Sequence, residues 1–419
     1  MKFSIITPTH SKSNVPFLAE LYSSIVEQTY DNWEWILSLN NGLRKSNIPQ
    51  HIRNNKKVKI YEDTSGNTNI GAIKNFAFHL GEGDILVEVD HDDLLLPNCL
   101  QRLAVAFFDP EIGFAYSDSI TYKMEGDSVP HNPLYGWTYK TVPWRGKERI
   151  SMNHFPPTSH ALSYIWFAPD HVRAWKTSVY RDIGGHNPDL SVCDDHELCI
   201  RTYLATKMEY IPEPLYVYRV TGDNTWLERN ELIQTTTKQL FDIYSRSLAE
   251  KDAQDNGLLK VDLGGGLNPY KDYKTVDIRP HADYVGDLNN GIPLPDNSVG
   301  VMHAHHIIEH LKDPIFTMKE IHRVMAHGGW VFIEVPSTDG RGAFQDPTHV
   351  SYWNQNSFFY YTRRQQARFI DNDSIRFQEF KLNTYYPNNF MRDNDISVVC
   401  AVLGAVKDGG VRHPGYLAI

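Results

Sequence analysis

Three carboxylates stand directly after an apolar stretch of the chain. The run Ile85–Val89 is rich in β-branched residues and predicts a buried strand, and Asp90, Asp92 and Asp93 follow it. Carboxylates this close repel one another unless a cation or a substrate neutralises them. Magnesium takes oxygen ligands and often combines one or two carboxylates with substrate phosphates. The pattern indicates a metal and diphosphate site, although an acidic turn capping a helix that starts near Pro97 would have the same sequence.

The segments before this strand alternate between strand and helix patterns. Strands are predicted at 2–6, 33–39 and 58–61, the second of them half-buried, and helices are predicted over 17–26 and 69–80. Such alternation predicts a mostly parallel sheet with helices on both faces, whose ligands bind beyond the carboxyl ends of the strands. Polar residues gather at that edge and indicate a nucleotide site: Thr7, Asn40, Asn41, Asp90 and Asp92.

The bulk composition is that of a soluble globular protein with two or more domains. The chain has 419 residues, of which 41% are hydrophobic and 22% charged, and its net charge of −10 argues against a nucleic-acid partner. The four cysteines show no paired metal spacing, which suits a reducing cytoplasm. No apolar run reaches the length of a membrane span, and Met1-Lys2 leads straight into a strand, so neither stable membrane insertion nor a signal peptide is expected.

The first 250 residues resemble the family 2 glycosyltransferases of the GT-A fold. The resemblance rests on four motifs in order: Ser4-Ile-Ile-Thr-Pro-Thr9, Gln28-Thr-Tyr-Asp-Asn-Trp33, Gly71-Ala-Ile-Lys74-Asn75 and Val89-Asp-His-Asp-Asp93. It implies a nucleotide-sugar donor and a divalent cation, Mn²⁺ or Mg²⁺, with a glycan or glycolipid as acceptor. Carried over to this chain, Asp92 is the metal ligand and Asp90 contacts the metal or the ribose.

The same resemblance assigns the remaining donor contacts. Thr7 and Pro8 would line the nucleoside pocket. The family usually has Asp where Asn40 or Asn41 stands, and it usually has Arg where Lys74 stands. An amide both donates and accepts hydrogen bonds, so the base that this turn recognises is left open.

An acidic pair opens a predicted helix in the stretch Ser191-Val-Cys-Asp194-Asp195-His196-Glu197-Leu198. Acids at a helix N-terminus are stabilised by its dipole, so capping alone would account for them. The family resemblance instead makes Asp195 the general base, which removes the proton of the acceptor hydroxyl in an inverting transfer. Upstream, an aromatic and irregular stretch over 124–170 is interpreted as the acceptor-binding region, and a helix is predicted over 170–182.

A polar segment over 249–257 predicts a boundary between a glycosyltransferase domain at 1–250 and a second α/β domain at 257–419. The second domain resembles class I S-adenosylmethionine-dependent methyltransferases. The motifs are Val261-Asp-Leu-Gly-Gly-Gly266, Thr275-Val-Asp277-Ile, Gly286-Asp287-Leu, Ile292-Pro-Leu-Pro-Asp-Asn-Ser298, His306-Ile-Ile-Glu-His310 and Ala326-His-Gly-Gly-Trp330.

That resemblance implies S-adenosylmethionine as cofactor and assigns its contacts. Asp277 would bind the ribose hydroxyls and Asp287 would lie near the adenine, while Asp262, Gly264 and Gly266 form the loop under the methionine part. The short spacing between Gly266 and Asp277 predicts an intervening helix cut to about one turn. The predicted fold is therefore α/β throughout: a GT-A-type nucleotide-binding domain followed by a Rossmann-like methyltransferase domain.

Two other interpretations of the second half remain open. It could be a catalytically inactive module that binds the acceptor or mediates assembly, and cofactor binding would distinguish this from a methyltransferase acting on the same glycan. Alternatively, His306-x-x-Glu309-His310 matches the spacing of an inverted zinc-protease motif, in which two histidines on one helical face would bind zinc in a hydrolase. The segment Asp346-Pro-Thr-His349 is interpreted as a lid or a structured loop.

Overall fold

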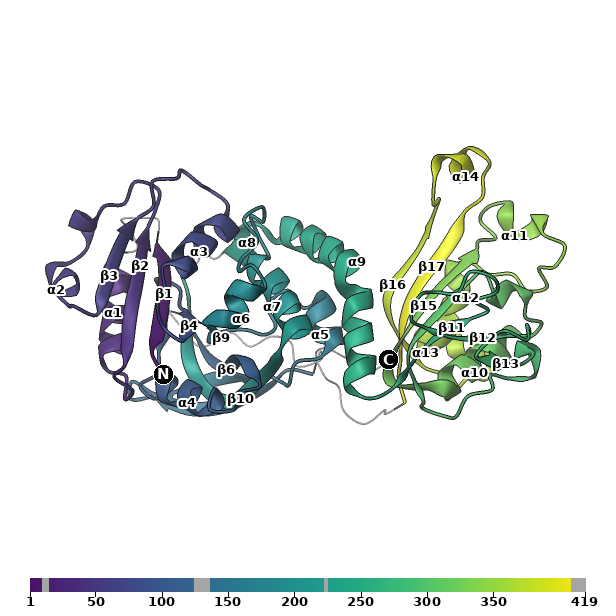
Figure 1. Cartoon of the computed structure of the whole chain (residues 1–419), viewed down its shortest axis with the longest axis horizontal. Coiled ribbons are helices and arrows are strands. Elements are labelled where there is room, and N and C mark those ends of the chain that lie inside the picture. Colours follow the sequence, from purple (N-terminus) through teal and green to yellow (C-terminus); the bar gives the residue numbers. More distant parts are fainter. Residues whose placement is uncertain (10–14, 124–135, 222–224, 408–419) are drawn as a thin grey trace. The chain divides into compact units, whose positions relative to one another are not determined.

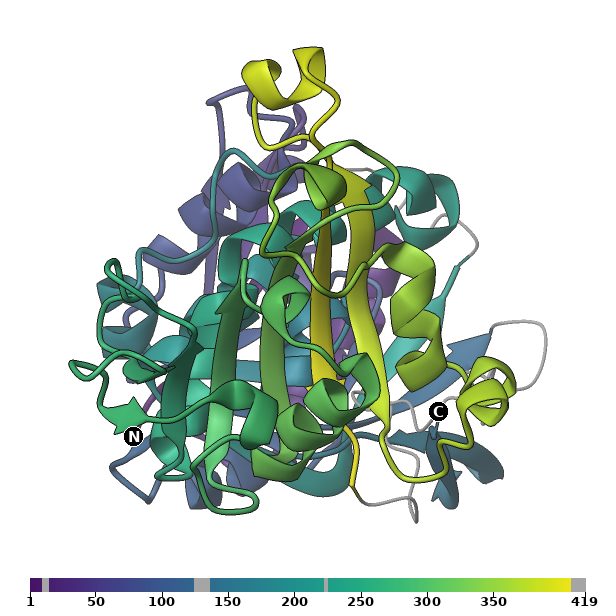
Figure 2. The same ribbon diagram turned by 90° about the vertical axis from the view of Figure 1, so that its right-hand side faces the viewer.

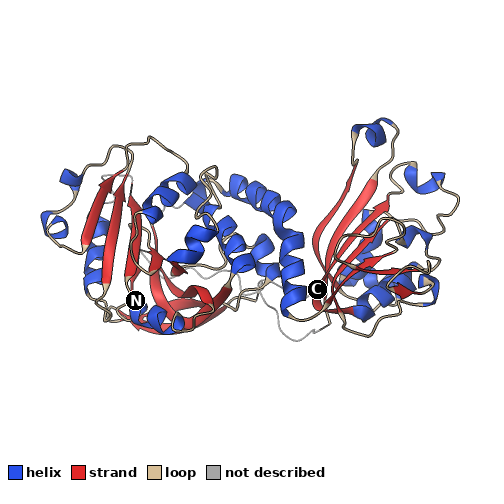
Figure 3. Cartoon of the chain, in the orientation of Figure 1, coloured by secondary structure: helices blue, strands red, loops and turns tan. Residues whose placement is uncertain are grey.

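The structure is a computed structural model of the chain, and it describes residues 1–9, 15–123, 136–221 and 225–407. The chain divides into two compact units, Met1–Ser245 and Arg246–Ile419. Each unit is built on a β-sheet flanked by helices, as Figures 1 and 3 show. The predicted α/β class is confirmed.

The first unit contains a ten-stranded sheet whose main path runs β3-β2-β1-β4-β9-β6-β10-β5, with the hairpin β7/β8 attached to β6. Its strands are β1 (Phe3–Thr9), β2 (Trp33–Leu39), β3 (Val58–Glu62), β4 (Ile85–Glu88), β5 (Leu94–Leu95), β6 (Ile112–Lys123), β7 (Thr138–Trp144), β8 (Lys147–Asn153), β9 (Arg173–Lys176) and β10 (Lys207–Val220). Its helices are α1 (Val15–Val26), α2 (Gln50–Arg53), α3 (Ile70–His79), α4 (Cys99–Ala106), α5 (Ser159–Tyr164), α6 (Thr177–Asp182), α7 (Asp194–Ala205), α8 (Thr225–Glu228) and the first part of α9 (Asn230–Asp255).

The strand order of this sheet reverses between β1 and β4. Strand β1 pairs in parallel with β2 on one side and with β4 on the other. Ligands of open α/β sheets bind outside the carboxyl ends of the strands at such a reversal. The structure therefore places the ends of β1 and β4, Thr9 and Glu88, at the expected ligand edge.

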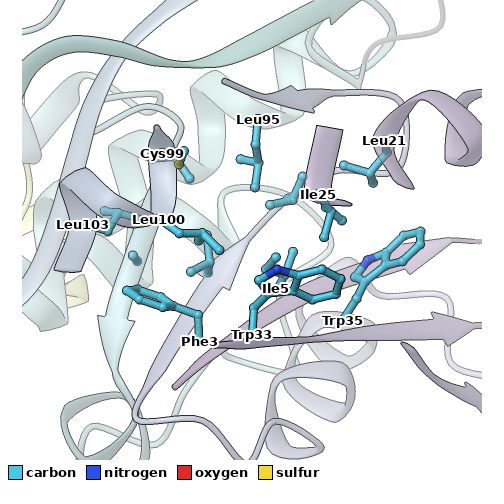
Figure 4. Close-up of a cluster of buried hydrophobic side chains, with 14 of the residues drawn as sticks. Phe3, Ile5, Leu21, Ile25, Trp33, Trp35, Leu95, Cys99, Leu100 and Leu103 are labelled. Carbon is cyan, nitrogen blue, oxygen red and sulfur yellow. The ribbon is translucent and has the colours of Figure 1, made fainter. Parts of the chain in front are cut away.

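Alternate side chains of β1 and β2 build the core on one face of this sheet. Phe3 and Ile5 of β1 lie with Trp33 and Trp35 of β2 in one buried cluster, which Leu21 of α1 also joins (Figure 4). The residues of β2 that point to the other face are buried as well, so the strand is covered on both sides. The prediction of a half-buried strand at 33–39 is wrong because neighbouring strands and helices enclose it completely.

Two further predictions for the first unit are corrected. The helix predicted over 170–182 is instead the short strand β9 followed by α6. Strand β9 lies antiparallel between β4 and β6, so Trp175 packs into the sheet rather than on a helical face. The stretch interpreted as irregular contains β7, β8 and α5; its residues 124–135 lie outside the described part of the chain.

The second unit holds a seven-stranded sheet in the order β13-β12-β11-β14-β15-β17-β16. Figure 2 shows the yellow strands β16 and β17 side by side next to the green strands of this sheet. The first five strands are parallel, and β17 is antiparallel to both of its neighbours. The elements are β11 (Leu259–Leu263), β12 (Lys274–Asp277), β13 (Tyr284–Val285), β14 (Val299–His305), α10 (Pro314–Val324), β15 (Met325–Pro336), α11 (Gly342–Gln345), α12 (Gln355–Thr362), α13 (Arg364–Ala367), β16 (Phe377–Tyr385), α14 (Asn389–Asp393) and β17 (Val398–Ala405).

The segment expected to link the domains is helical. Helix α9 continues through it to Asp255, and within the second unit its Arg246 stacks on Tyr270 and Phe332 while its Glu250 accepts a hydrogen bond from Tyr273.

Between β11 and β12 the described chain forms only turns. The single helical turn predicted there is therefore absent, because the connection is too short to cross back over the sheet as a helix.

Candidate functional sites

The three acids after β4 have different environments. Asp93 is buried, and its carboxylate accepts hydrogen bonds from the Tyr216 hydroxyl at 2.8 Å and the Arg219 backbone at 2.7 Å. Burial and the neighbouring carboxylates raise the pKa of Asp93 well above its usual range. It therefore anchors the turn to β10, and this leaves Asp90 and Asp92 with 33% and 18% of their side-chain surfaces exposed.

Asp90 and Asp92 each face an imidazole across the turn after β4. Asp90 faces the His171 imidazole at 3.8 Å, and Asp92 faces the His91 imidazole at 3.9 Å. Burial raises the pKa of Asp92, and the nearby charge of Asp90 raises it further. A cation would relieve this cost, and phosphate oxygens of a donor would complete its coordination.

The ends of β1 and β2 carry the polar groups predicted for the nucleoside pocket. The Thr7 hydroxyl is fully buried and accepts a hydrogen bond from the Trp35 indole at 3.0 Å, so it faces the core. Thr9 Oγ1 and Asn40 Oδ1 are buried without a hydrogen-bond partner. Buried polar atoms without partners are costly, which makes these two groups better candidates than Thr7 for contacting a ligand.

The other predicted residues of this pocket are less informative. Pro8 is buried within β1 and offers only its carbonyl and its ring. Asn41 is exposed and has a left-handed backbone with φ of 49°. The side chain of Asn40 thus lies closer to the core than that of its neighbour, and Thr9 is a residue that the sequence analysis did not select.

A network of buried charges connects the ligand edge to helix α7. The Lys74 ammonium lies 2.6 Å from Glu88 and 3.7 Å from Asp194, and the Arg173 guanidinium lies 2.9 Å from Glu88 and 2.7 Å from Asp195. Although burial opposes ionisation, the two cations hold the pKa of Glu88 well below its usual range. Lys74, predicted to contact the donor, is itself buried and directed at these carboxylates.

The two acids at the start of α7 are distinct. Asp194 is almost fully buried, and burial raises its pKa to about 7. Asp195 keeps 22% of its side-chain surface exposed, and although burial opposes ionisation, Arg173 and Lys74 hold its pKa below the usual value. Asp195 is therefore the ionised and more accessible member of the pair.

Sequence analysis missed Glu88 and Arg173, which connect the two acidic motifs. The signals were a lone acid within the apolar strand at 85–89 and a basic residue within Arg-Ala-Trp-Lys176. Charged residues are rarely buried unless they are paired, so each of them needed a partner. The identity of that partner could not be inferred, because it depends on β9 lying beside β4.

In the second unit, glycines and two carboxylates shape the loop after β11. Gly264 has φ of 74°, and a Cβ atom there would lie 2.4 Å from Ile307. The Gly266 amide donates to Asp277 at 3.0 Å, and the Arg279 amide donates to the other oxygen of the same carboxylate at 2.9 Å. Asp277 thus fixes the loop and keeps a further acceptor lone pair on each oxygen.

The other predicted cofactor residues differ in accessibility. Asp262 is buried, contacting the His303 imidazole at 2.8 Å and accepting from the Tyr270 amide at 2.7 Å, so it anchors the loop from below. Asp287 is exposed and caps the turn Leu288–Asn290. A pocket of about 270 Å³ opens beside Gly266 and Asp277, just below the volume typical of ligand sites, about 300–1,000 Å³.

The histidine motif after β14 does not form the helix that the zinc-hydrolase alternative requires. His306 has a left-handed backbone with φ of 52°, and only the single turn Ile308–His310 follows it. Hydrogen bonds to Glu309 and Glu334 raise the pKa of His306 to about 9. The expectation that His306 and His310 share a helical face is therefore wrong, since no helix connects them.

The two halves of the chain match different family models. The model described as glycosyl transferase family 2 matches residues 4–171, and the model described as methyltransferase domain matches residues 246–333. The predicted resemblance is confirmed for both halves. Residues 4–171 are thus similar to family 2 glycosyltransferases, and residues 246–333 are similar to methyltransferase domains.

Individual relatives are distant and longer than the matched region. The O-antigen biosynthesis protein RfbC of Myxococcus xanthus is 23% identical over 59% of this chain and 18% of its own length. The poly(ribitol-phosphate) β-N-acetylglucosaminyltransferase TarS of Staphylococcus aureus is 23% identical over 52% of this chain and 35% of its own length. This chain therefore spans well under half of either relative.

Solved structures of two glycosyltransferases align with part of the chain. Residues 1–349 of S. aureus TarS in complex with UDP-GlcNAc align with a TM-score of 0.41 at 17% identity, covering 59% of this chain and 72% of that one. The mannosyltransferase PcManGT of Pyrobaculum calidifontis, in complex with GDP-Man and Mn²⁺, aligns with a TM-score of 0.41 at 16% identity, covering 60% and 69% of the two chains. None of the described helices is long and apolar enough to cross a membrane.

Proposed function

We propose that the first unit is an inverting, metal-dependent glycosyltransferase, which moves a sugar from a nucleotide-sugar donor to a hydroxyl of a glycan or glycolipid. The observation that carries the proposal is the convergence of Asp90, Asp92 and Asp195 on one end of the sheet. The segment that leads into β9 joins them, because His171 faces Asp90 and Arg173 pairs with Asp195. One short segment would thus contact both the donor site and the base.

The residues of this edge have complementary tasks in the proposed transfer. Asp92 and Asp90 would hold Mn²⁺ or Mg²⁺, which would neutralise charge on the departing nucleoside diphosphate. Thr9 and Asn40 would contact the nucleoside, with Thr7, Pro8 and Asn41 around them. The oxygen of the acceptor hydroxyl bonds to the anomeric carbon while Asp195 takes the hydroxyl proton and the nucleoside diphosphate leaves. Lys74 positions the acidic pair through Asp194.

We propose further that the second unit binds S-adenosylmethionine and methylates the same glycan. The cradle formed by Gly264, Gly266 and Asp277 supports this proposal. The missing helix after β11 supports the alternative, a catalytically inactive module that binds the acceptor or mediates assembly. The domain bounds 1–250 and 257–419 belong to the same proposal.

The protein is proposed to work in the cytoplasm without stable membrane insertion and without a nucleic-acid partner. Cys99, Cys193 and Cys199 are buried as free thiols, as suits a reducing compartment. The net charge of −10 disfavours binding to nucleic-acid phosphates.

Release of nucleoside diphosphate tests the first proposal. Purified protein is incubated with a panel of nucleotide sugars, Mn²⁺ and glycan acceptors. Asp195→Asn is expected to slow acceptor-dependent release by about 10²–10⁴-fold, because the amide cannot take the proton. The control is Asp182→Asn, an exposed acid at the end of α6, which should leave the rate unchanged. Equal rates in the two variants would remove Asp195 from the mechanism.

Calorimetry with S-adenosylhomocysteine tests the second proposal. Asp277→Asn removes one charge-assisted hydrogen bond to the ligand. Binding that weakens by about tenfold or more in this variant would support a cofactor site. The exposed Asp371, whose φ of 50° asparagine tolerates, provides the control Asp371→Asn. No binding to the wild-type chain would favour the inactive module.

A further inference from the structure

We propose that Glu309, His310 and His349 bind a divalent transition-metal ion at the end of β14 in the second unit. One ligand atom from each of the three side chains lies within 4.8 Å of the others. Ligands at about 2.0–2.2 Å from a zinc ion stand about 3–4 Å from one another, so small side-chain rotations would close the site. The ligand set differs from the predicted zinc motif, because His349 takes the place given to His306.

Backbone hydrogen bonds hold the two segments of this cluster together. The Glu309 carbonyl accepts from the amides of Val350 at 2.9 Å and Ser351 at 3.0 Å. The Ser351 hydroxyl donates to the Ile308 carbonyl at 2.9 Å. The turn that carries Glu309 is thereby fixed against the segment that carries His349, and the imidazoles of His310 and His349 lie with ring centres 5.0 Å apart.

Glu309 Oε2 and His349 Nε2 are available as ligand atoms, whereas Glu309 Oε1 faces the His306 imidazole at 3.6 Å. Glu309 is 2% exposed, and its Oε2 is buried without a hydrogen-bond partner. His349 Nδ1 lies 2.9 Å from the Ala343 carbonyl and must donate to it, so Nε2 carries a lone pair. That Nε2 points toward Glu309 Oε1 at 4.0 Å and Asp346 Oδ2 at 3.9 Å.

Surrounding groups support the imidazoles as they do in established metal sites. Metal-binding histidines usually donate their second ring N–H to a carbonyl or carboxylate, which fixes the ring and the tautomer. The Ala343 carbonyl has this role for His349, and the Thr348 carbonyl lies 3.2 Å from His310 Nδ1. An unpartnered buried carboxylate oxygen beside two oriented imidazoles matches the donor set that zinc, iron and cobalt prefer over magnesium.

The site lies where the strand order of the second sheet reverses. Strands β11 and β14 are neighbours, and Ile307, two residues before Glu309, packs against Gly264 of the loop after β11. Three protein ligands leave a coordination position open, as in catalytic zinc sites. If the proposed methyl transfer holds, that position would orient a hydroxyl of the acceptor glycan; the metal site itself does not depend on that proposal.

Titration with Co²⁺ tests the site in the full chain. The protein is stripped with a chelator and dialysed, and visible absorption is recorded as Co²⁺ is added. We expect bands of histidine-coordinated cobalt that Zn²⁺ displaces. His349→Ala and the half-buried His310→Gln should each lower the affinity at least about tenfold. The exposed His327→Ala should leave the bands unchanged.

The outcomes separate this proposal from methyl transfer. Absent bands in the wild-type chain, or equal affinity in His310→Gln and His327→Ala, would overturn the metal site. Far-ultraviolet circular dichroism of each variant verifies folding, and His310→Gln is the decisive variant should His349→Ala fail to fold. Cobalt binding without S-adenosylhomocysteine binding would sustain the metal site and end the proposal of methyl transfer.

Discussion

Both units place their candidate sites where the order of the parallel strands in a mixed sheet reverses, but they support these sites by different means. In the first unit, the buried ions Lys74, Glu88 and Arg173 lie beneath the acids that face the ligand edge. In the second unit, glycine backbone and anchored amides shape the loop, and Asp262 and Asp277 hold it in place.

This difference determines which changes each site tolerates. A buried ion network fails when one charge is removed, because its partner is left without compensation in a medium of low dielectric constant. A loop of glycines fails when volume is added, because there is no room for a Cβ atom. The first site should therefore be sensitive to charge and the second to size.

Removing Arg173 should have the largest effect. Arg173→Met leaves Glu88 with Lys74 alone and frees Asp195 from its ion pair. Loss of one partner of a buried pair costs about 3–5 kcal/mol in the free energy of unfolding. Urea denaturation of the full chain measures it.

A second change should restore part of this loss. Adding Glu88→Gln to Arg173→Met removes one of the three acids that then share Lys74, so the double variant should be more stable than the single one. Arg181→Met is the control, since Arg181 is exposed and donates to the Gly81 carbonyl from the surface. Similar stability of Arg173→Met and Arg181→Met would show that the charge network does not support the first site.

Adding one methyl group to the glycine loop should have an intermediate effect. Gly264 and Gly257 both have positive φ, 74° and 62°, but only at Gly264 would a Cβ atom collide, 2.4 Å from Ile307. Gly264→Ala should cost about 2 kcal/mol more than Gly257→Ala, because overpacking adds to the same backbone strain. Chemical denaturation compares the two, and equal losses would contradict the role assigned to this loop.

The smallest effect is expected at Glu34, a buried acid of the first unit far from the ligand edge. Burial alone would raise its pKa, but hydrogen bonds from Lys2, Ser4 and Lys59 outweigh this and lower it to about 2. A depressed pKa stabilises the fold above the ordinary value of 4.5, and this stability is lost as pH falls toward 2.

Glu34→Gln should therefore lower stability at neutral pH by about 2 kcal/mol and flatten its decline between pH 4.5 and about 2. Glu82→Gln is the matched control, because Glu82 also pairs with Lys59 but is 66% exposed. Thermal unfolding across this pH range measures both variants. An unchanged pH profile in Glu34→Gln would show that buried charge in this unit need not contribute to stability.

Periodicity and spacing predicted most of the elements that carry the sites, and they failed where contacts are distant in sequence. Strands β1 to β4 and helix α7 were recovered because their apolar patterns are local. Strand β9 was taken for a helix because four residues carry too little periodicity to identify a strand. The pairing of Glu88 with Arg173, and the approach of His349 to Glu309, depend on how separate segments fold together.

The central claim is that Asp92 helps to hold a metal-bound nucleoside diphosphate at the end of β4. Calorimetric titration with a panel of nucleoside diphosphates, with and without Mn²⁺, tests it on the wild-type chain and on Asp92→Ala. Asp31→Ala, an exposed acid before β2, serves as the control. We predict binding of one nucleotide that requires Mn²⁺ and weakens at least about tenfold in Asp92→Ala alone. Binding of equal strength without Mn²⁺, or in Asp92→Ala, would contradict the claim and leave the acidic turn as a helix cap.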